Sequence, residues 1–141
     1  MAGEGHYRVK YLMDNTQGIY DELIENLFYA YPALQPPMTW LDNVPPSAPS
    51  ALKVTSIDNG YTELNWQPAT DNDQRNKPMY VIYASNEYPV DTKKAENIVA
   101  QSIRETSYIY APIQPWNAKK YFAVTAIDRC GNESAPINGD K

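Results

Sequence analysis

The sequence predicts an all-β sandwich of seven short strands, preceded by an α-helical extension. Two apolar runs at its centre, residues 80–84 and 121–128, alternate with the period of two that half-buried strands require. Similar short runs lie on either side, and turn-forming residues separate them. These observations favour two packed antiparallel sheets, because each sheet must bury its apolar face against another layer.

The expected strands follow one another at short spacing between residues 45 and 138. They cover residues 51–57, 62–66, 79–84, 98–101, 107–111, 120–128 and 134–137. Asp58-Asn59-Gly60 is a tight-turn signal between the first two strands, whereas a longer polar loop at 67–77 separates the second from the third. Thr62, Leu64 and Trp66 alternate inward on the second strand. The same reasoning assigns Tyr80, Ile82 and Ala84 to the inward face of the third strand, and Phe122, Val124 and Ala126 to that of the sixth. Seven strands at this spacing are typical of an immunoglobulin-like sandwich.

The same region carries short motifs in a fixed order. They are Pro-Ser-Ala-Pro at 46–49, Trp66 at the end of the second strand, Tyr-Val-Ile-Tyr at 80–83, Thr-Ser-Tyr at 106–108, Ile-Gln-Pro at 113–115 and Tyr-Phe-Ala-Val-Thr-Ala-Ile-Asp at 121–128. Together they resemble a fibronectin type III domain from Pro45 to Asn138. The motif at 128–134 looks like the last hairpin of the versions attached to bacterial carbohydrate-active enzymes. One position departs from the family, which has a tyrosine where this chain has Lys120. Either a bulge precedes the sixth strand or the usual tyrosine corner is absent.

Residues 1–44 carry a different pattern, an amphipathic helix followed by a proline-rich segment. Ile19, Leu23 and Leu27 recur every four residues, and Tyr20, Ile24 and Phe28 form the adjacent row of the same apolar stripe. Pro32 ends the helix. The following segment contains Trp40 and several prolines, which indicates a stiff tether pinned down by its apolar residues. The helix is expected to pack on a larger domain; in this chain it folds back on the sandwich or forms a dimer, because so large an apolar patch is rarely left in water.

This segment carries a second set of motifs. Gly-Ile-Tyr-Asp-Glu-Leu at 18–23 is followed by Tyr-Pro-Ala-Leu-Gln-Pro-Pro-Met-Thr-Trp-Leu-Asp at 31–42. Both are similar to the C-terminal end of a glycosyl-hydrolase-like TIM-barrel family of exported bacterial proteins. The resemblance implies that residues 1–44 are the remnant of a hydrolase-like barrel, and that residues 45–138 are a domain attached to it. It further implies a secreted or lipoprotein parent, in the periplasm or at the outer-membrane surface, whose catalytic carboxylates lie in the barrel.

Composition limits the other classes of function. The formal net charge is −5, and the lysines and arginines are scattered, which argues against nucleic acid as a partner. The single cysteine, Cys130, excludes an intrachain disulfide and a multi-cysteine metal site. It lies in a turn beside Arg129 with no paired histidine, so an inert thiol is expected. His6 has neither cysteine partners nor a paired base and is expected to be an exposed terminal residue.

The acidic residues do not form a recognisable catalytic pair. Asp58, Asp71, Asp73 and Asp128 fall on loops or strand ends, where solvated turn-forming carboxylates are the rule. Asp71-Asn72-Asp73 has oxygen ligands suited to calcium, but no glycine and distal glutamate follow at the loop-motif spacing, which favours a plain polar loop. No catalytic residue, metal site or cofactor is therefore expected.

Four aromatic residues are candidates for binding: Tyr88, Tyr108, Tyr110 and Trp116. Flat exposed rings stack on sugar faces in carbohydrate-binding modules. The structural alternative is that Tyr108 or Tyr110 fills the core while Trp116 covers the loop before the sixth strand. Trp116 and Tyr88 are retained as the candidate ligand contacts.

The chain is thus expected to be a non-catalytic accessory domain, a spacer or docking surface, of an exported glycoside-hydrolase-like protein. Its expected partner is the catalytic barrel of the same parent, and the chain itself is not expected to be an enzyme. The alternative is a carbohydrate-binding module that recognises a polysaccharide through exposed aromatic rings.

Overall fold

The computed structural model describes residues 13–18, 20, 21, 23, 31–73 and 77–140. The chain divides into two compact units, Met1–Pro32 and Ala33–Lys141. In the first unit, a 3₁₀ turn, η1, spans Thr16–Gly18. Tyr20, Asp21 and Leu23 have helical backbone, while the rest of the helix predicted at 19–28 lies outside the described residues.

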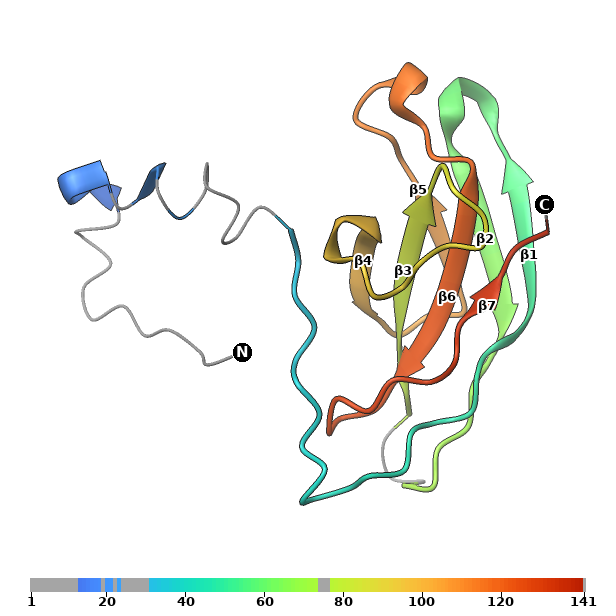
Figure 1. The fold of residues 1–141 in the computed structure, drawn as a ribbon. Coiled ribbons are helices and arrows are strands. Elements are labelled where there is room, and N and C mark those ends of the chain that lie inside the picture. Colours follow the sequence, from blue (N-terminus) through green and yellow to red (C-terminus); the bar gives the residue numbers. More distant parts are fainter. Residues whose placement is uncertain (1–12, 19, 22, 24–30, 74–76, 141) are drawn as a thin grey trace. The chain divides into compact units, whose positions relative to one another are not determined.

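The described part of the second unit contains seven strands in two antiparallel sheets (Figure 1). The three-stranded sheet has the order β1-β2-β5, with β1 at Ser50–Ser56, β2 at Thr62–Gln67 and β5 at Ser107–Tyr110. The four-stranded sheet has the order β4-β3-β6-β7, with β3 at Met79–Ser85, β4 at Ile98–Ile103, β6 at Tyr121–Ile127 and β7 at Ile137–Asn138. The all-β prediction is therefore confirmed for this unit.

The first six strands begin and end within two residues of the predicted positions, but the last one lies later than predicted. The chain meets β6 first where Glu133 bridges Ile127, and again where Ile137 pairs with Val124. Glu133 and Ile137 are four residues apart, whereas their partners on β6, Ile127 and Val124, are three residues apart. One extra residue therefore bulges out of the segment that ends in β7. Pro136 lies in this bulge, and it has no N–H to donate to the sheet.

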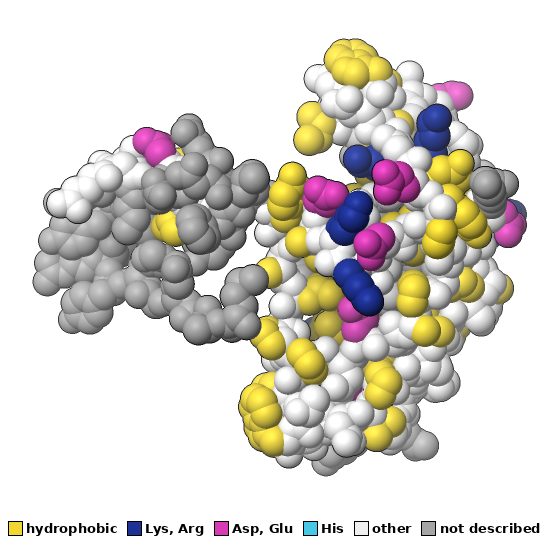
Figure 2. Space-filling view, in the orientation of Figure 1, with side chains coloured by type: hydrophobic (Ala, Val, Ile, Leu, Met, Phe, Trp, Pro, Cys, Tyr) yellow, Lys and Arg dark blue, Asp and Glu magenta, His cyan; other side chains and the backbone are white. Residues whose placement is uncertain are grey.

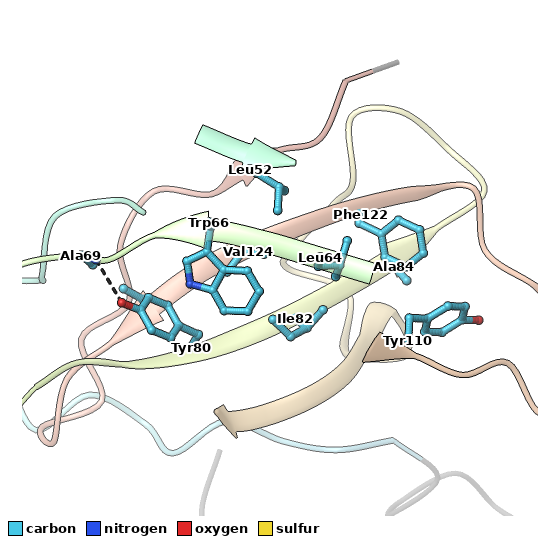
Figure 3. Close-up of a cluster of buried hydrophobic side chains, with 11 residues drawn as sticks. Leu52, Leu64, Trp66, Ala69, Tyr80, Ile82, Ala84, Tyr110, Phe122 and Val124 are labelled. Atoms are coloured by element: carbon cyan, nitrogen blue, oxygen red, sulfur yellow. Dashed lines mark hydrogen bonds between the residues drawn. The ribbon is translucent and has the colours of Figure 1, made fainter. Parts of the chain in front are cut away.

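The main core lies between the two sheets, as the inward-facing prediction requires. Leu64 and Trp66 of β2 meet Tyr80 and Ile82 of β3 in one buried cluster (Figure 3). The rings of Trp66 and Tyr80 pack edge to face with their centroids 5.2 Å apart. The Tyr80 hydroxyl accepts a hydrogen bond from the backbone N–H of Ala69, so the one polar atom of this ring is also satisfied.

The four-stranded sheet is buried on its outer face as well. Val81 and Tyr83 of β3 are fully buried although they point away from the main core, and they form a second cluster with Ala123. Val90, from the connection between β3 and β4, is part of this cluster, and Leu34 packs against it. Both faces of β3 and β6 are thus buried and mostly apolar, so the prediction that these two runs form half-buried strands is wrong. Strands buried on both faces read as near-continuous apolar runs.

Candidate functional surfaces

Two regions at opposite ends of the sandwich are candidates for function. The first, called here the platform, consists of Ile57, Tyr61, Ile113 and Trp116 on the β1–β2 turn and the β5–β6 loop. The second, called here the clasp, is the β6–β7 turn at 128–132 together with the tether at 33–44 that it holds. Hydrophobic side chains gather at both ends in the space-filling view (Figure 2).

The platform is built where two turns pack against each other. The β1–β2 turn contains the 3₁₀ segment η2, Asp58–Gly60, and the β5–β6 loop contains η4, Pro115–Asn117 (Figure 1). Gly60 has a φ of +80°, and a Cβ at this position would lie 3.1 Å from the Cβ of Ala118 and 3.3 Å from the carbonyl oxygen of Pro115. A glycine is needed here for both its backbone conformation and the close approach of the two turns.

The side chains beside this contact are exposed. Trp116 is 79% exposed and Ile113 is 95% exposed, while Ile57 and Tyr61 are roughly half exposed. Trp116 therefore does not cover the loop before β6, and that part of the structural alternative is wrong. The other part is confirmed, because Tyr110 is buried and packs edge to face on Phe122 at 5.1 Å (Figure 3).

Backbone hydrogen bonds hold the loop that carries Trp116. The N–H of Asn117 donates to the Gln114 carbonyl at 2.9 Å, and the N–H of Ala118 donates to the Pro115 carbonyl at 3.3 Å. The hydroxyl of Tyr110 accepts the N–H of Lys119 at 3.3 Å, which ties the end of the loop to the core. Trp116 is thus presented to solvent on an ordered turn.

Tyr88, the second candidate ligand contact, lies on the connection between β3 and β4. It is less exposed than Trp116, and its ring packs edge to face on Tyr121 with centroids 5.4 Å apart.

The pairing of β3 with β6 has no register shift from Met79 to Ser85, so no bulge lies within β6 itself.

The clasp is organised by a buried carboxylate that the sequence suggested would be solvated. Asp128 forms a turn as expected, but it is buried. One of its carboxylate oxygens accepts the backbone N–H groups of Cys130 at 2.7 Å and of Asn132 at 2.8 Å. The other oxygen accepts the side-chain amide of Asn132 at 2.8 Å. These three hydrogen bonds fix the conformation of the β6–β7 turn.

The β6–β7 turn also holds the tether. The N–H of Met38 donates to the Cys130 carbonyl at 2.7 Å, and the Asn132 amide donates to the Asp42 carbonyl at 3.0 Å. Gly131 has a φ of +81°, and a Cβ there would lie 3.0 Å from the carbonyl oxygens of two tether residues, Gln35 and Pro36. Leu34 of the tether packs on the outer-face apolar cluster, whereas Trp40 is 77% exposed, so the expectation of a tether pinned by its apolar residues is wrong for Trp40.

A hydroxyl–carboxylate network covers the outer face of the four-stranded sheet beside the clasp. The hydroxyls of Tyr83 and Thr125 both donate to the same carboxylate oxygen of Glu133, each at 2.6 Å. Burial raises the pKa of Tyr83 far above its usual range, and the hydrogen bond to Glu133 and its negative charge raise it further. The tyrosine therefore stays a neutral donor.

The other candidate residues have structural roles where they are described. The Asp73 carboxylate lies 3.4 Å from the Nε of Arg129, and Cys130 is buried. Among the described residues, no group of three or more histidine, cysteine, aspartate or glutamate side chains is arranged to hold a metal ion. No helix of the described part is long and apolar enough to cross a membrane. His6 lies outside the described residues.

Two shallow grooves lie on either side of the tether at the clasp end. One, of about 260 Å³, lies between Leu34 and the sheet residues Val81 and Ile127. The other, of about 430 Å³, lies between the prolines of the tether and the β6–β7 turn. Neither includes a residue of the platform.

The second unit is thus a β-sandwich domain whose described acidic residues near the clasp are engaged in structural contacts. No family model matches the sequence. The chain is 33% identical over 137 residues to a protein described as glycosyl hydrolase YngK from Bacillus subtilis (strain 168). The match covers 95% of this chain and 26% of that protein, so the chain spans about a quarter of the relative's length. It is homologous to a part of a glycosyl hydrolase.

Proposed function

We propose that this chain is a non-catalytic accessory region, a spacer or docking element, of an exported glycoside-hydrolase-like protein. The homology to part of a glycosyl hydrolase supports the kind of parent. Seven strands divided between sheets of three and four, together with the motifs at 46–49 and 121–128, support a fibronectin type III domain. The partner is then the catalytic barrel of the same parent, and the location is extracytoplasmic.

The clasp is the observation that carries the spacer role. A spacer sets distance and orientation only if the segment that joins it to its neighbour is ordered. Here the hydrogen bonds to Met38 and Asp42 and the close approach of Gly131 make the tether part of the sandwich. Whatever precedes the tether in the parent is then joined to a fixed segment rather than to a flexible linker.

Two acidic residues, Asp73 and Asp128, make structural contacts, which supports a non-catalytic role. Glycoside hydrolysis needs a carboxylic acid and a carboxylate on opposite sides of a sugar-binding cleft. Asp128 is buried and accepts three hydrogen bonds from its own turn, and Asp73 pairs with Arg129. These contacts favour structural roles for both carboxylates.

A hydrolysis assay tests this proposal. The purified chain is incubated with aryl glycosides and with polysaccharides, alongside a longer protein that also contains the barrel. We expect hydrolysis by the longer protein alone. Turnover by the purified chain that is lost in an Asp128→Asn or Asp73→Asn variant would belong to the chain rather than to a contaminating hydrolase, and would overturn the non-catalytic assignment.

A second candidate function is carbohydrate recognition through Trp116 and Tyr88. The observation that favours it is that Trp116 is exposed on an ordered turn together with Ile57, Tyr61 and Ile113, because apolar side chains gathered in one exposed patch commonly mark an interaction site. The two functions are compatible, since an accessory domain that binds the polysaccharide also places the barrel on it.

A further inference from the structure

We propose that the platform binds the surface of an insoluble, neutral polysaccharide, with Trp116 and Tyr61 as the stacking rings. This inference rests on the second candidate function, carbohydrate recognition, and adds to it the surface that binds and the physical form of the ligand. It also assigns Tyr61 and Ile113, which the sequence did not single out.

The platform is preorganised for stacking. Gly60 allows the β1–β2 turn to approach the β5–β6 loop at the carbonyl oxygen of Pro115. Tyr61 follows Gly60 in the chain, and Trp116 follows Pro115, so both rings lie next to this contact in sequence. The loop hydrogen bonds to Gln114 and Pro115 fix the backbone on both sides of Trp116. A ring that is already held in place loses little conformational entropy on binding, so more of its contact energy appears as affinity.

The chemistry around the rings suits a neutral sugar. The β5–β6 loop at 111–120 contains no aspartate or glutamate, while Lys119 and Lys120 end it and Asp58 lies on the β1–β2 turn, so both signs of charge occur and no cluster of one sign selects a charged sugar. Asn59, Gln114 and Asn117 lie beside the apolar side chains and are exposed. A pyranose ring presents a C–H face, which packs on an aromatic ring, and hydroxyl edges, which an amide both donates to and accepts from. Rings flanked by amides therefore match a sugar better than they match a wholly apolar partner surface.

The shape of the site selects the form of the ligand. Ile113 and Trp116 are almost fully exposed at one end of the domain, and neither of the two grooves described above includes them. A single soluble oligosaccharide gains affinity when a cleft surrounds it, whereas exposed side chains at the end of a domain contact one side of a ligand only. Packed chains in an insoluble polysaccharide offer such a one-sided surface, with many sugar rings in the same plane.

The test measures retention of the full chain on microcrystalline cellulose and on chitin, using Trp116→Ala and, as a matched control, Trp40→Ala. Both tryptophans are almost equally exposed, at 79% and 77%, but they lie at opposite ends of the domain. We expect the unmutated chain to be retained on at least one polymer. Trp116→Ala should lower the affinity about tenfold or more, as expected for loss of a central aromatic anchor, and Tyr61→Ala should lower it less. Trp40→Ala should change it by less than about twofold, and Trp116→Tyr should restore part of the binding.

Other outcomes overturn the inference in distinguishable ways. Equal loss in both tryptophan variants would indicate unspecific apolar adsorption. Binding of soluble cello- or chito-oligosaccharides that depends on Tyr88 and not on Trp116 would keep carbohydrate recognition and reject the platform. Self-association abolished by Trp116→Ala, measured by light scattering, would assign the surface to a second copy of the chain. No retention on either polymer would reject the platform, and the absence of binding to the soluble oligosaccharides as well would also reject the carbohydrate-binding function.

Discussion

The clasp end and the platform end of the sandwich each expose a tryptophan, yet they are built on different physical principles. At the clasp end, polar groups are buried and satisfied, and Trp40 lies outside this hydrogen-bond network. At the platform end, a glycine contact joins two turns, and Trp116 is held outward on one of them. Exposure alone therefore does not identify a functional ring; the construction beneath it does. The clasp should govern stability, and the platform should govern binding.

The largest expected effect comes from the buried carboxylate of the clasp. Asp128→Ala removes the acceptor of three hydrogen bonds and leaves two backbone N–H groups and the Asn132 amide without it. We expect the free energy of unfolding to fall by about 3 kcal/mol, because buried donors without partners are costly. Urea denaturation measures it, and Asp128→Asn, which keeps one acceptor oxygen, should lose less. A loss below about 0.5 kcal/mol for the alanine variant would contradict the stabilising role of the clasp.

A pair of glycine variants compares the two ends directly. Gly131 and Gly60 have nearly the same φ, +81° and +80°, but Gly131 faces backbone oxygens of the tether at 3.0 Å, whereas the nearest atom to Gly60 is a side-chain carbon at 3.1 Å. Gly131→Ala should lower the free energy of unfolding by about 2 kcal/mol, and Gly60→Ala by about 1 kcal/mol. The reverse order in urea denaturation would mean that the platform contact is the tighter one.

The hydroxyl–carboxylate network beside the clasp predicts a dependence on pH. Because the pKa of Tyr83 is higher in the folded chain than in the unfolded chain, its contribution to stability is fully present below pH of about 10 and is lost as the pH rises further. Tyr83→Phe should cost about 1 kcal/mol at neutral pH through the lost hydrogen bond to Glu133. It should also flatten the fall in stability above pH of about 10. If the free energy of unfolding falls equally with pH in the unmutated chain and in Tyr83→Phe, Tyr83 is not the source of the pH dependence.

The smallest expected effect is on stability at the platform. Trp116→Ala and Trp40→Ala should each change the free energy of unfolding by less than about 0.5 kcal/mol, because both side chains are mostly exposed. Thermal unfolding followed by circular dichroism measures both. A marked loss for Trp116→Ala alone would mean that the indole supports the loop, and binding data for that variant would then need Trp116→Tyr as the reference.

Strand positions and inward faces could be predicted from the sequence because a strand places successive side chains on opposite faces. Leu64 and Trp66 fall on the core side for this reason. The burial of Tyr83 and Thr125 on the other face could not be predicted in the same way, since it depends on Val90 and on the tether covering that face. The last strand was misplaced because the bulge at Pro136 breaks the local alternation.

The candidate site was predicted only in part. Trp116 was named from its chemistry, but its outward position depends on how the β5–β6 loop packs against Gly60. Asp128 was recognised as a turn-forming residue at a strand end, yet its part in the clasp depends on a segment much earlier in the chain, because the Asn132 amide that it holds also donates to the Asp42 carbonyl.

The amino-acid pattern alone thus specifies the first six strands, their inward faces, the tight turns and the absence of an intrachain disulfide, because these follow from local periodicity and composition. The clasp and the platform arise only in the folded chain. Asp42 and Asn132 are 90 residues apart when they form their hydrogen bond, and Gly60 meets Ala118 across the end of the domain. Such contacts join loops, whose sequences encode turn geometry but not the partner against which each turn packs.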